Sequence, residues 1–322
     1  MNVVVTRAGF LTSVQDLGRT GFRQFGVSTS GALDSFALRV ANLLVGNDED
    51  AAGLEITFGG LHLQFGDERI VAWCGGEFEA QIGSRVLAAG HIAYLQSGDE
   101  LKFGHAEIGC RCWLAISGGI NVPVVLGSRS TDVRAHFGGF EGRALRDGDQ
   151  LLLGEFRGPE TAAKGISSWT PPHDWASRAS RDPNLRFVRS ADWNRFDDVT
   201  IQRFTNHEFN VSPDSDRMGV RLDGPELKRK DETDLISEAV APGTIQVPPS
   251  GKPILLLGDC QTIGGYPKIA HVITADLGIA AQLRAGDRVR FCEVSLQDAH
   301  RLLVERERDM QRFRIGLSLK NS

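Results

Sequence analysis

The stretch Leu145-Arg146-Asp147-Gly148-Asp149-Gln150-Leu151 places a Gly-Asp pair between apolar residues that alternate with polar ones. Glycine tolerates a positive φ and aspartate hydrogen-bonds to nearby backbone, so the stretch predicts a turn that leads into a half-buried strand. The same pattern recurs at residues 95–101 and 283–289. The spacing of the three copies is too irregular for a solenoid. The three turn–strand units therefore predict a mainly β fold, built as a barrel or a sandwich.

The composition is that of an ordinary globular chain, with 41% hydrophobic and 24% charged residues among 322. The net charge of -5 comes from charges of both signs, with no dense Lys/Arg block, so neither nucleic acid nor a membrane is an expected partner. Residues 1–20 contain no apolar stretch of signal-peptide length, and the longest aliphatic run, residues 254–257, is far too short to span a bilayer. We therefore expect a cytoplasmic protein.

The cysteines and histidines form no metal-binding pattern. There are five cysteines without a Cys-x-x-Cys spacing, and the eight histidines include no His-Glu-x-x-His. An odd number of scattered cysteines predicts reduced, mostly buried thiols. We expect no metal in this chain. The cysteines are Cys74, Cys110, Cys112, Cys260 and Cys292.

Many short strands and few helices are predicted from the periodicity of the apolar residues. The further strand candidates are residues 60–65, 70–73, 110–116, 185–189, 219–222, 254–257 and 271–274. Helical spacing occurs at residues 32–45, before a Gly46 C-cap, and at about 192–205. A third, highly charged helix is predicted to begin at Ser295, which forms a capping-box-like pair with Asp298.

The chain is predicted to divide into two β subdomains. Residues 158–182 mix Gly, Ser, Pro and Trp without periodicity, which is typical of a linker. We place an N-terminal subdomain at 1–160, the linker at 161–182, and a C-terminal subdomain with a final helix at 183–322. Each half lies within the usual range of domain sizes.

Polar residues cluster in several Gly-rich turns beside apolar strands. The densest cluster places Asp259, Gln261, Tyr266 and Lys268 within ten residues, directly after a strand that is predicted to be buried. The diglycine within it permits a close approach of the backbone to a ligand. This segment is predicted to form one wall of a ligand site. The candidates from other clusters are Asp16, Arg19, Arg217 and Gln246.

Three common catalytic motifs are missing from the sequence. No stretch has the Gly-x-x-x-x-Gly-Lys-Ser/Thr pattern of a phosphate loop, and Ser117-Gly118-Gly119 lacks the Gly-x-Ser-x-Gly elbow of serine hydrolases. None of the three methionines neighbours a lysine, as a biotin-attachment site would require. If ATP or biotin takes part, another polypeptide must help to carry it.

The same clusters carry a family resemblance. The motifs, in order, are Gln15-Asp16…Gly18-Arg19, Ser30-Gly31-Ala32-Leu33-Asp34, Ala41-Asn42-Leu43-Leu44-Val45-Gly46-Asn47, Leu54-Glu55, Arg217-Met218-Gly219, Ile245-Gln246-Val247-Pro248 and Gly264-Gly265-Tyr266-Pro267. Together they resemble the biotin-dependent carboxyltransferase-like family, also called allophanate hydrolase subunit 2, from about Gly9 to Phe291. Within this family, the chain is most similar to the branch that supplies one component of the three-component bacterial 5-oxoprolinase.

The resemblance implies a cyclophilin-like β-barrel architecture in two subdomains. It also implies two partners: a B-type subunit, which forms the other half of the carboxyltransferase-like module, and a separate A-type subunit. The active site is expected near a junction between subunits. The expected activity is ATP-dependent hydrolysis of 5-oxo-L-proline to L-glutamate by the complex, with this chain inactive alone. The family leaves two alternatives: biotin-dependent carboxyl transfer to urea or a related amide, and non-catalytic regulation of a kinase inhibitor.

The expected substrate suggests roles for the candidate residues. A lactam offers one acceptor and one N–H donor, which a glutamine amide can match, and an arginine fork suits the substrate carboxylate. Gln246 or Gln261, with Arg19 or Arg217, would provide this set, and Tyr266 is a further binding candidate. The catalytic candidates, with either aspartate as general base or as the group that orients water, are Asp16, Asp259 and Lys268.

Overall fold

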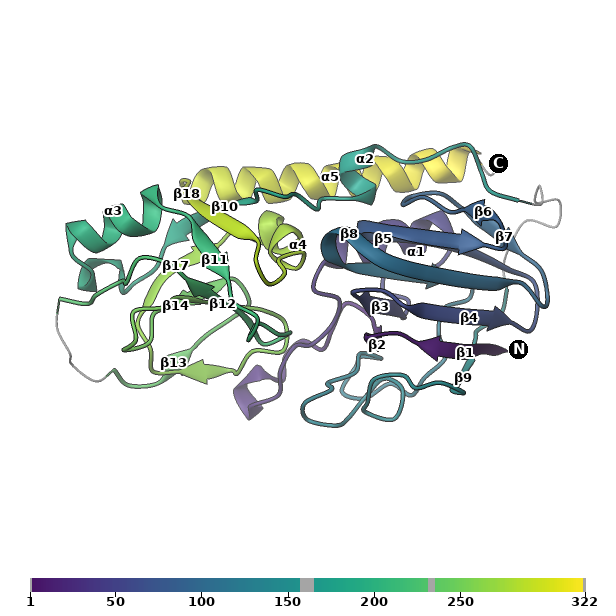
Figure 1. Cartoon of the computed structure of the whole chain (residues 1–322), viewed down its shortest axis with the longest axis horizontal. Helices are drawn as coiled ribbons and strands as arrows, with labels where there is room; N and C mark the ends of the chain where they lie inside the picture. Colours follow the sequence, from purple (N-terminus) through teal and green to yellow (C-terminus); the bar gives the residue numbers. More distant parts are fainter. Residues whose placement is uncertain (1, 157–164, 231–234, 321–322) are drawn as a thin grey trace. The chain divides into compact units, whose positions relative to one another are not determined.

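The computed structural model describes residues 2–156, 165–230 and 235–320, and the chain divides into two compact units (Figure 1). Unit 1 comprises Met1–Thr20, Ser30–Ala179 and Arg314–Ser322. Unit 2 comprises Gly21–Thr29 and Ser180–Phe313. Residues 161–164 of the predicted linker lie outside the described residues. The predicted subdomain boundaries stay a prediction, and the compact units add two short segments that are distant in sequence.

Unit 1 is built on a curled nine-stranded sheet. Its strand order is β2-β3-β8-β4-β1-β9, and β5 pairs with β8, β6 and β7. The strands are β1 (Asn2–Ala8), β2 (Leu11–Gln15), β3 (Gly53–Thr57), β4 (Leu61–Phe65), β5 (Arg69–Ile82), β6 (Arg85–Val86), β7 (Ala93–Leu95), β8 (Glu100–Ile116) and β9 (Gln150–Leu152). Figure 1 shows the long strands β5 and β8 lying side by side along this sheet. Its apolar face forms one core cluster that includes Trp73, Phe65 and Phe103.

Unit 2 is a closed seven-stranded barrel in the order β10-β17-β14-β15-β12-β11-β18. These strands are β10 (Asn184–Arg189), β11 (Phe209–Val211), β12 (Gly219–Asp223), β14 (Thr244–Gln246), β15 (Ile254–Leu256), β17 (Lys268–Val272) and β18 (Arg288–Glu293). A separate two-stranded sheet pairs β13 (Glu238–Ala239) with β16 (Ile263–Gly264). The barrel core contains packed aromatic rings, with Phe204 stacked on Phe291 at a centroid distance of 4.8 Å.

The helices are few, and most are short. They are α1 (Ser35–Leu44), α2 (His173–Ala176), α3 (Asp198–Asn206), α4 (Leu277–Ala280) and α5 (Leu296–Lys320), with the 3-10 turns η1 (Arg23–Phe25), η2 (Trp193–Arg195) and η3 (Thr274–Asp276). In the described ranges, no helix combines the length and the apolar character that crossing a bilayer requires.

The predicted mainly β class is confirmed, and several element boundaries differ from the sequence expectation. The strands predicted at 70–73 and 110–116 are longer, as Arg69–Ile82 and Glu100–Ile116. The first helix begins at Ser35 because the Asp34 side chain caps it by accepting from the Ala37 N–H at 3.0 Å. The second is split into η2 and α3, since Asp197 caps a new helix at that point. The strand predicted at 271–274 instead spans Lys268–Val272 and is followed by η3.

Candidate functional site

The eight candidate residues fall into the two units. Asp16 and Arg19 belong to unit 1, and the other six belong to unit 2. In unit 2 the six cluster around the ends of four barrel strands and the loop from Leu257 to Pro267. The six in unit 2 are Arg217, Gln246, Asp259, Gln261, Tyr266 and Lys268.

Arg217 and Asp259 form a buried ion pair. Strands β12 and β15 are antiparallel with Gly219 opposite Leu256, so the residues just before β12 and just after β15 emerge together. Arg217 Nε lies 2.8 Å from Asp259 Oδ2, and Arg217 Nη2 lies 3.2 Å from Oδ1. The two side chains are only 6% and 5% exposed. The Arg217 guanidinium thus binds both carboxylate oxygens of Asp259, and this bidentate pair holds the start of the loop in place.

Gln246 and Gln261 form an amide pair beside this loop. Gln246 ends β14 and is buried, whereas Gln261 is exposed. Gln261 Nε2 donates to Gln246 Oε1 at 3.2 Å. A Cβ at Gly264 would lie 2.6 Å from Gln246 Nε2, so glycine there leaves room for the amide. The pair therefore places amide donor and acceptor groups beside the loop from Leu257 to Pro267.

Lys268 is held as a cation at the start of β17. Its Nζ lies 2.8 Å from Glu238 Oε2 and 3.3 Å from Asp192 Oδ2, and its side chain is 8% exposed. Burial alone would lower the pKa of Lys268, but the hydrogen bonds and charges of Glu238 and Asp192 outweigh it and raise the pKa above its ordinary value. Lys268 thus suits electrostatic stabilisation better than proton abstraction.

His271 follows Lys268 on β17 and is neutral near pH 7. Its Nδ1 lies 3.2 Å from the Thr244 hydroxyl. Burial, and then the positive charge of Lys268, lower the pKa of His271 from its ordinary value of 6.5, while Asp192 opposes them. Sequence reasoning missed this residue because its partners come from three different strands or turns.

Arg23 is a second residue that the sequence did not reveal. It lies in η1, far from the barrel in sequence, yet its segment belongs to unit 2. Its Nη2 donates to the carbonyl oxygen of Val240 and, at 3.2 Å, to that of Gln261. Arg23 therefore ties the loop that carries Gln261 to the segment before β14. No local sequence signal marks this contact.

In unit 1, Asp16 and Arg19 are enclosed by polar neighbours. The Asp16 carboxylate accepts from the hydroxyls of Ser128 and Ser130, at 2.6 and 2.5 Å, and from backbone N–H groups on both sides. The buried Arg19 side chain donates to the carbonyl oxygen of Ser130, and its guanidinium lies 4.6 Å from the Phe137 ring centroid. These contacts organise the turn after β2.

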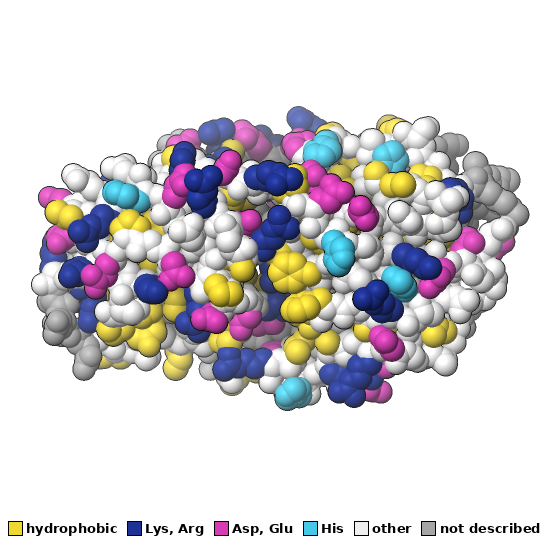
Figure 2. Space-filling view, in the orientation of Figure 1, with side chains coloured by type: hydrophobic (Ala, Val, Ile, Leu, Met, Phe, Trp, Pro, Cys, Tyr) yellow, Lys and Arg dark blue, Asp and Glu magenta, His cyan; other side chains and the backbone are white. Residues whose placement is uncertain are grey.

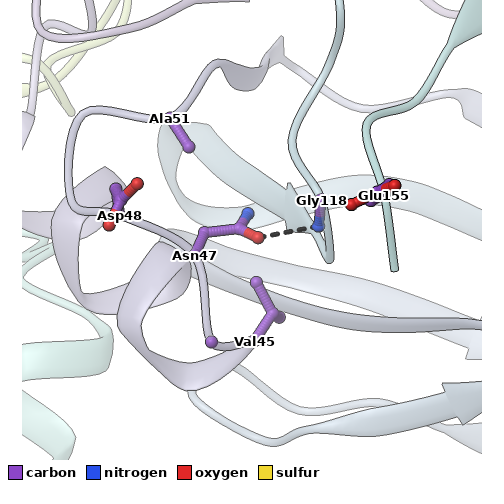
Figure 3. A pocket seen from close by; sticks show the side chains of 7 residues that line it. Val45, Asn47, Asp48, Ala51, Gly118 and Glu155 are labelled. Atoms are coloured by element: carbon purple, nitrogen blue, oxygen red, sulfur yellow. Dashed lines mark hydrogen bonds between the residues drawn. The ribbon is translucent and has the colours of Figure 1, made fainter. Parts of the chain in front are cut away.

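Unit 1 also contains a polar hollow of about 210 Å³ at the end of α1 (Figure 3). Figure 3 shows Asn47 pointing toward Gly118, whose N–H donates to Asn47 Oδ1 at 2.8 Å, with Asp48 and Glu155 on opposite sides. Across the ranges that the structure describes, no three His, Cys, Asp or Glu side chains are grouped as a metal site.

The surface carries mixed charges and a few exposed apolar side chains. Figure 2 shows Lys and Arg interspersed with Asp and Glu over the visible face. Near the loop of the candidate site, large apolar side chains are exposed: Ile236 is 88% exposed, Ile263 61% and Tyr266 46%. Ile263 belongs to β16, and Ile236 and Tyr266 lie close in sequence to the β13–β16 pair.

Comparison with known proteins identifies the family of this fold. The family model of the carboxyltransferase domain, subdomains A and B, matches residues 25–293, and the chain belongs to this family. The chain is 40% identical over 309 residues to the 5-oxoprolinase C subunit of Escherichia coli (strain K12), a match that covers 96% of this chain and 95% of that protein. The corresponding C subunit of Haemophilus influenzae is 38% identical, with 96% of both chains covered.

Solved structures give the same result. The chain superposes on the Kluyveromyces lactis urea carboxylase with a TM-score of 0.90 and 31% identity, covering 97% of this chain and 29% of that one. It superposes on TTHA0988 with a TM-score of 0.79 and 32% identity, covering 90% of this chain and 55% of that one. The chain thus spans less than a third of the urea carboxylase. The resemblance drawn from the sequence motifs is confirmed.

Proposed function

We propose that the chain is the C subunit of a 5-oxoprolinase, which hydrolyses 5-oxo-L-proline to L-glutamate with ATP together with an A-type and a B-type subunit. The observation that carries this proposal is the similarity along almost the full length of both C-subunit relatives. The urea carboxylase and urea amidolyase relatives match only a fraction of their own length, so they define the family rather than the activity.

The amide pair in unit 2 suits recognition of the lactam. A lactam ring presents one C=O and one N–H, and Gln261 with Gln246 can donate to the first and accept from the second. Lys268 supplies positive charge for the substrate carboxylate or for an oxyanion that forms on ring opening. The exposed Tyr266 ring can cover the substrate.

Asp259, which is ion-paired, and Asp16, which is enclosed by polar neighbours, both suit positioning roles. Because Arg217 engages both oxygens of Asp259, we assign to this pair the task of fixing the loop, rather than proton abstraction. Asp16 holds its turn in the same way, with Arg19 packed on Phe137. A general base or an activating phosphoryl group then comes from another chain of the complex.

We assign ATP and the completion of the site to the partners. A phosphate-binding Gly-rich loop that leads into a helix with Lys-Ser/Thr is missing from the sequence, so the chain offers no cradle of that type. The exposed side chains of Ile236, Ile263 and Tyr266 mark the surface where a B-type subunit would pack against the site. The complex would be cytoplasmic, where its thiols stay reduced.

Reconstitution tests this proposal. The chain is mixed with candidate A-type and B-type subunits, and L-glutamate formed from 5-oxo-L-proline and ATP is measured with each component omitted in turn. We expect turnover only with all three. Gln261→Ala should lower kcat/KM about tenfold, while the exposed Gln202→Ala on α3 leaves it unchanged. Undiminished turnover without this chain would refute the proposal and would leave a regulatory role open.

Because the family includes urea carboxylase, biotin-dependent carboxyl transfer is the second candidate activity. In that case the biotin is carried by another polypeptide. The same chain, mixed with a biotin carboxylase and a biotinylated carrier, would carboxylate urea in the presence of bicarbonate and ATP. Urea-dependent ATP consumption without glutamate formation would select this activity over lactam hydrolysis.

A further inference from the structure

A second pocket lies in unit 1, away from every candidate residue discussed above. It has a volume of about 320 Å³ and is bounded by β5, the segment after β6, and the chain around α2. Volumes of this size are at the lower end of those that hold small organic ligands. Its apolar part includes Trp73 and Phe78, whose rings meet edge to face at 6.1 Å. The Trp73 indole N–H already donates to the Leu87 carbonyl oxygen, so this wall offers an aromatic surface without a free donor.

The polar lining of the pocket consists of one carboxylate, that of Glu77, with His91, Thr170, His173 and Ser177. Glu77 lines it and sits at a β-bulge, because the register between β5 and β8 shifts on both sides of this residue. Bulges redirect a side chain out of the regular alternation. Within the described ranges, the Glu77 side chain forms no hydrogen bond or ion pair, and no Lys or Arg lines the pocket with it. The carboxylate therefore lines the pocket without a lysine or arginine partner.

Two more acceptors lie in the same pocket. His91 Nδ1 is 2.9 Å from the carbonyl oxygen of Ser167, which can only accept, so Nδ1 carries the hydrogen and Nε2 is the acceptor of the neutral ring. Ser177 is 5% exposed, and its hydroxyl oxygen has no hydrogen-bond partner among the described residues. Turning this hydroxyl toward a ligand would break no existing hydrogen bond.

We propose that this pocket binds a small organic cation, namely a primary ammonium group on an aromatic or branched apolar body. The ammonium group has three donors, which match the Glu77 carboxylate, His91 Nε2 and the Ser177 hydroxyl. The aromatic wall attracts a cation as well as an apolar body. Because no Lys or Arg of the described ranges lines the pocket, an α-amino acid, whose carboxylate would share the pocket with that of Glu77, should bind more weakly than the amine. The site is thus distinct from one for 5-oxoproline or glutamate.

A matched ligand series tests the proposal on the full chain. Isothermal titration calorimetry is carried out with 2-phenylethylamine as the cation, 2-phenylethanol as the neutral analogue, and L-phenylalanine as the analogue with an added carboxylate. We expect saturable binding of the amine, and binding of the other two that is about tenfold weaker or undetectable. Equal affinity for the alcohol, or no saturable binding of the amine, would overturn the proposal.

Variants locate the binding. Glu77→Gln keeps the shape of the side chain and should weaken the amine about tenfold or more, and Ser177→Ala should weaken it less. Glu79→Gln is the matched control, since Glu79 is exposed on the same strand and does not line the pocket. If Glu77→Gln and Glu79→Gln bind the amine equally well, the pocket assignment is wrong. Because this test needs no turnover, its failure leaves the proposed enzymatic function untouched.

Discussion

At the scale of single residues, the stability of the fold depends on the buried Arg217–Asp259 pair. Removing one partner of a buried pair leaves the other charge without compensation, and this costs about 3–5 kcal/mol of unfolding free energy. We therefore expect Asp259→Asn to lower the free energy of unfolding by about that amount, measured by urea denaturation with a fixed m-value. Unchanged stability would mean that the pair is open to solvent.

A double variant separates stability from chemistry at this pair. Arg217→Met combined with Asp259→Leu should recover most of the stability, because apolar residues of similar volume replace both charges. If the pair only positions the loop, the reconstituted complex should keep part of its turnover with this stable double variant. A complete loss of turnover in a fully folded double variant would instead place one of the two charges in the reaction.

Gly264 tests the amide pair at the same scale. A Cβ at this position would lie 2.6 Å from Gln246 Nε2, so Gly264→Ala must displace the amide rather than a backbone atom. Small displacements of a binding group can lower activity about a hundredfold while the fold persists. We expect a fall in kcat/KM of about tenfold to a hundredfold, with thermal stability near that of the wild type. Gly316→Ala on α5, where an added Cβ meets no atom within 4 Å, is the control.

At the scale of elements, strand β17 contains His271, whose protonation should change the stability of the protein. His271 has a lowered pKa in the folded chain, because burial and Lys268 disfavour its charged form, with Asp192 opposing them. In the unfolded chain it regains its ordinary pKa of 6.5 and takes up a proton first. Acid therefore favours unfolding, so stability should fall as the pH drops from 6.5 toward the folded pKa. His271→Gln should flatten this part of the curve in a pH series of urea denaturation, whereas His300→Gln on exposed α5 should not.

The same strand shows how far the sequence alone could predict the fold. Alternating apolar residues and Gly-Asp turns correctly predicted a mainly β chain, and Ser295 correctly marked the start of α5. The sequence prediction left out the first residues of β17, because Lys268 is a charged residue that follows a Gly-rich stretch and was therefore assigned to the loop. Its burial depends on Asp192 and Glu238, which lie 76 and 30 positions away in sequence. Local patterns cannot reveal such a partner.

The residues of the candidate site likewise include some that the sequence suggested and others that it could not suggest. Crowding of polar residues behind a buried strand drew attention to the loop from Asp259 to Lys268, and six of the eight candidates lie in unit 2. That this loop forms a ligand site stays a prediction. The roles of Asp16 and Asp259 as bases stay untested predictions. Each carboxylate already accepts several hydrogen bonds, which favours the positioning roles proposed above. Arg23 could not be found, since only the tertiary fold brings η1 to Gln261.

At the scale of the whole molecule, both units contain cysteines, so the reactivity of the thiols can be compared between the units. Cys74, Cys110 and Cys112 are buried in unit 1, Cys260 is buried in unit 2, and only Cys292 is exposed. All five are free thiols. Burial raises the pKa of Cys74, Cys112 and Cys260, which suppresses the reactive thiolate. The sequence expectation of mostly buried thiols is confirmed.

Titration of the native protein with a thiol-reactive chromophore should therefore show a single fast-reacting group. Cys292→Ser should remove the fast phase, because the other four thiols react only when the chain around them opens. Denaturant should restore all five in the wild type and four in the variant. If a second thiol reacts quickly in the native state, its position identifies the unit that opens: Cys260 would mean that the site loop of unit 2 opens, and Cys74 or Cys112 that the sheet of unit 1 does. Because the reagent detects opening without substrate or partner, this measurement establishes whether the isolated chain holds its candidate site closed before any complex is assembled.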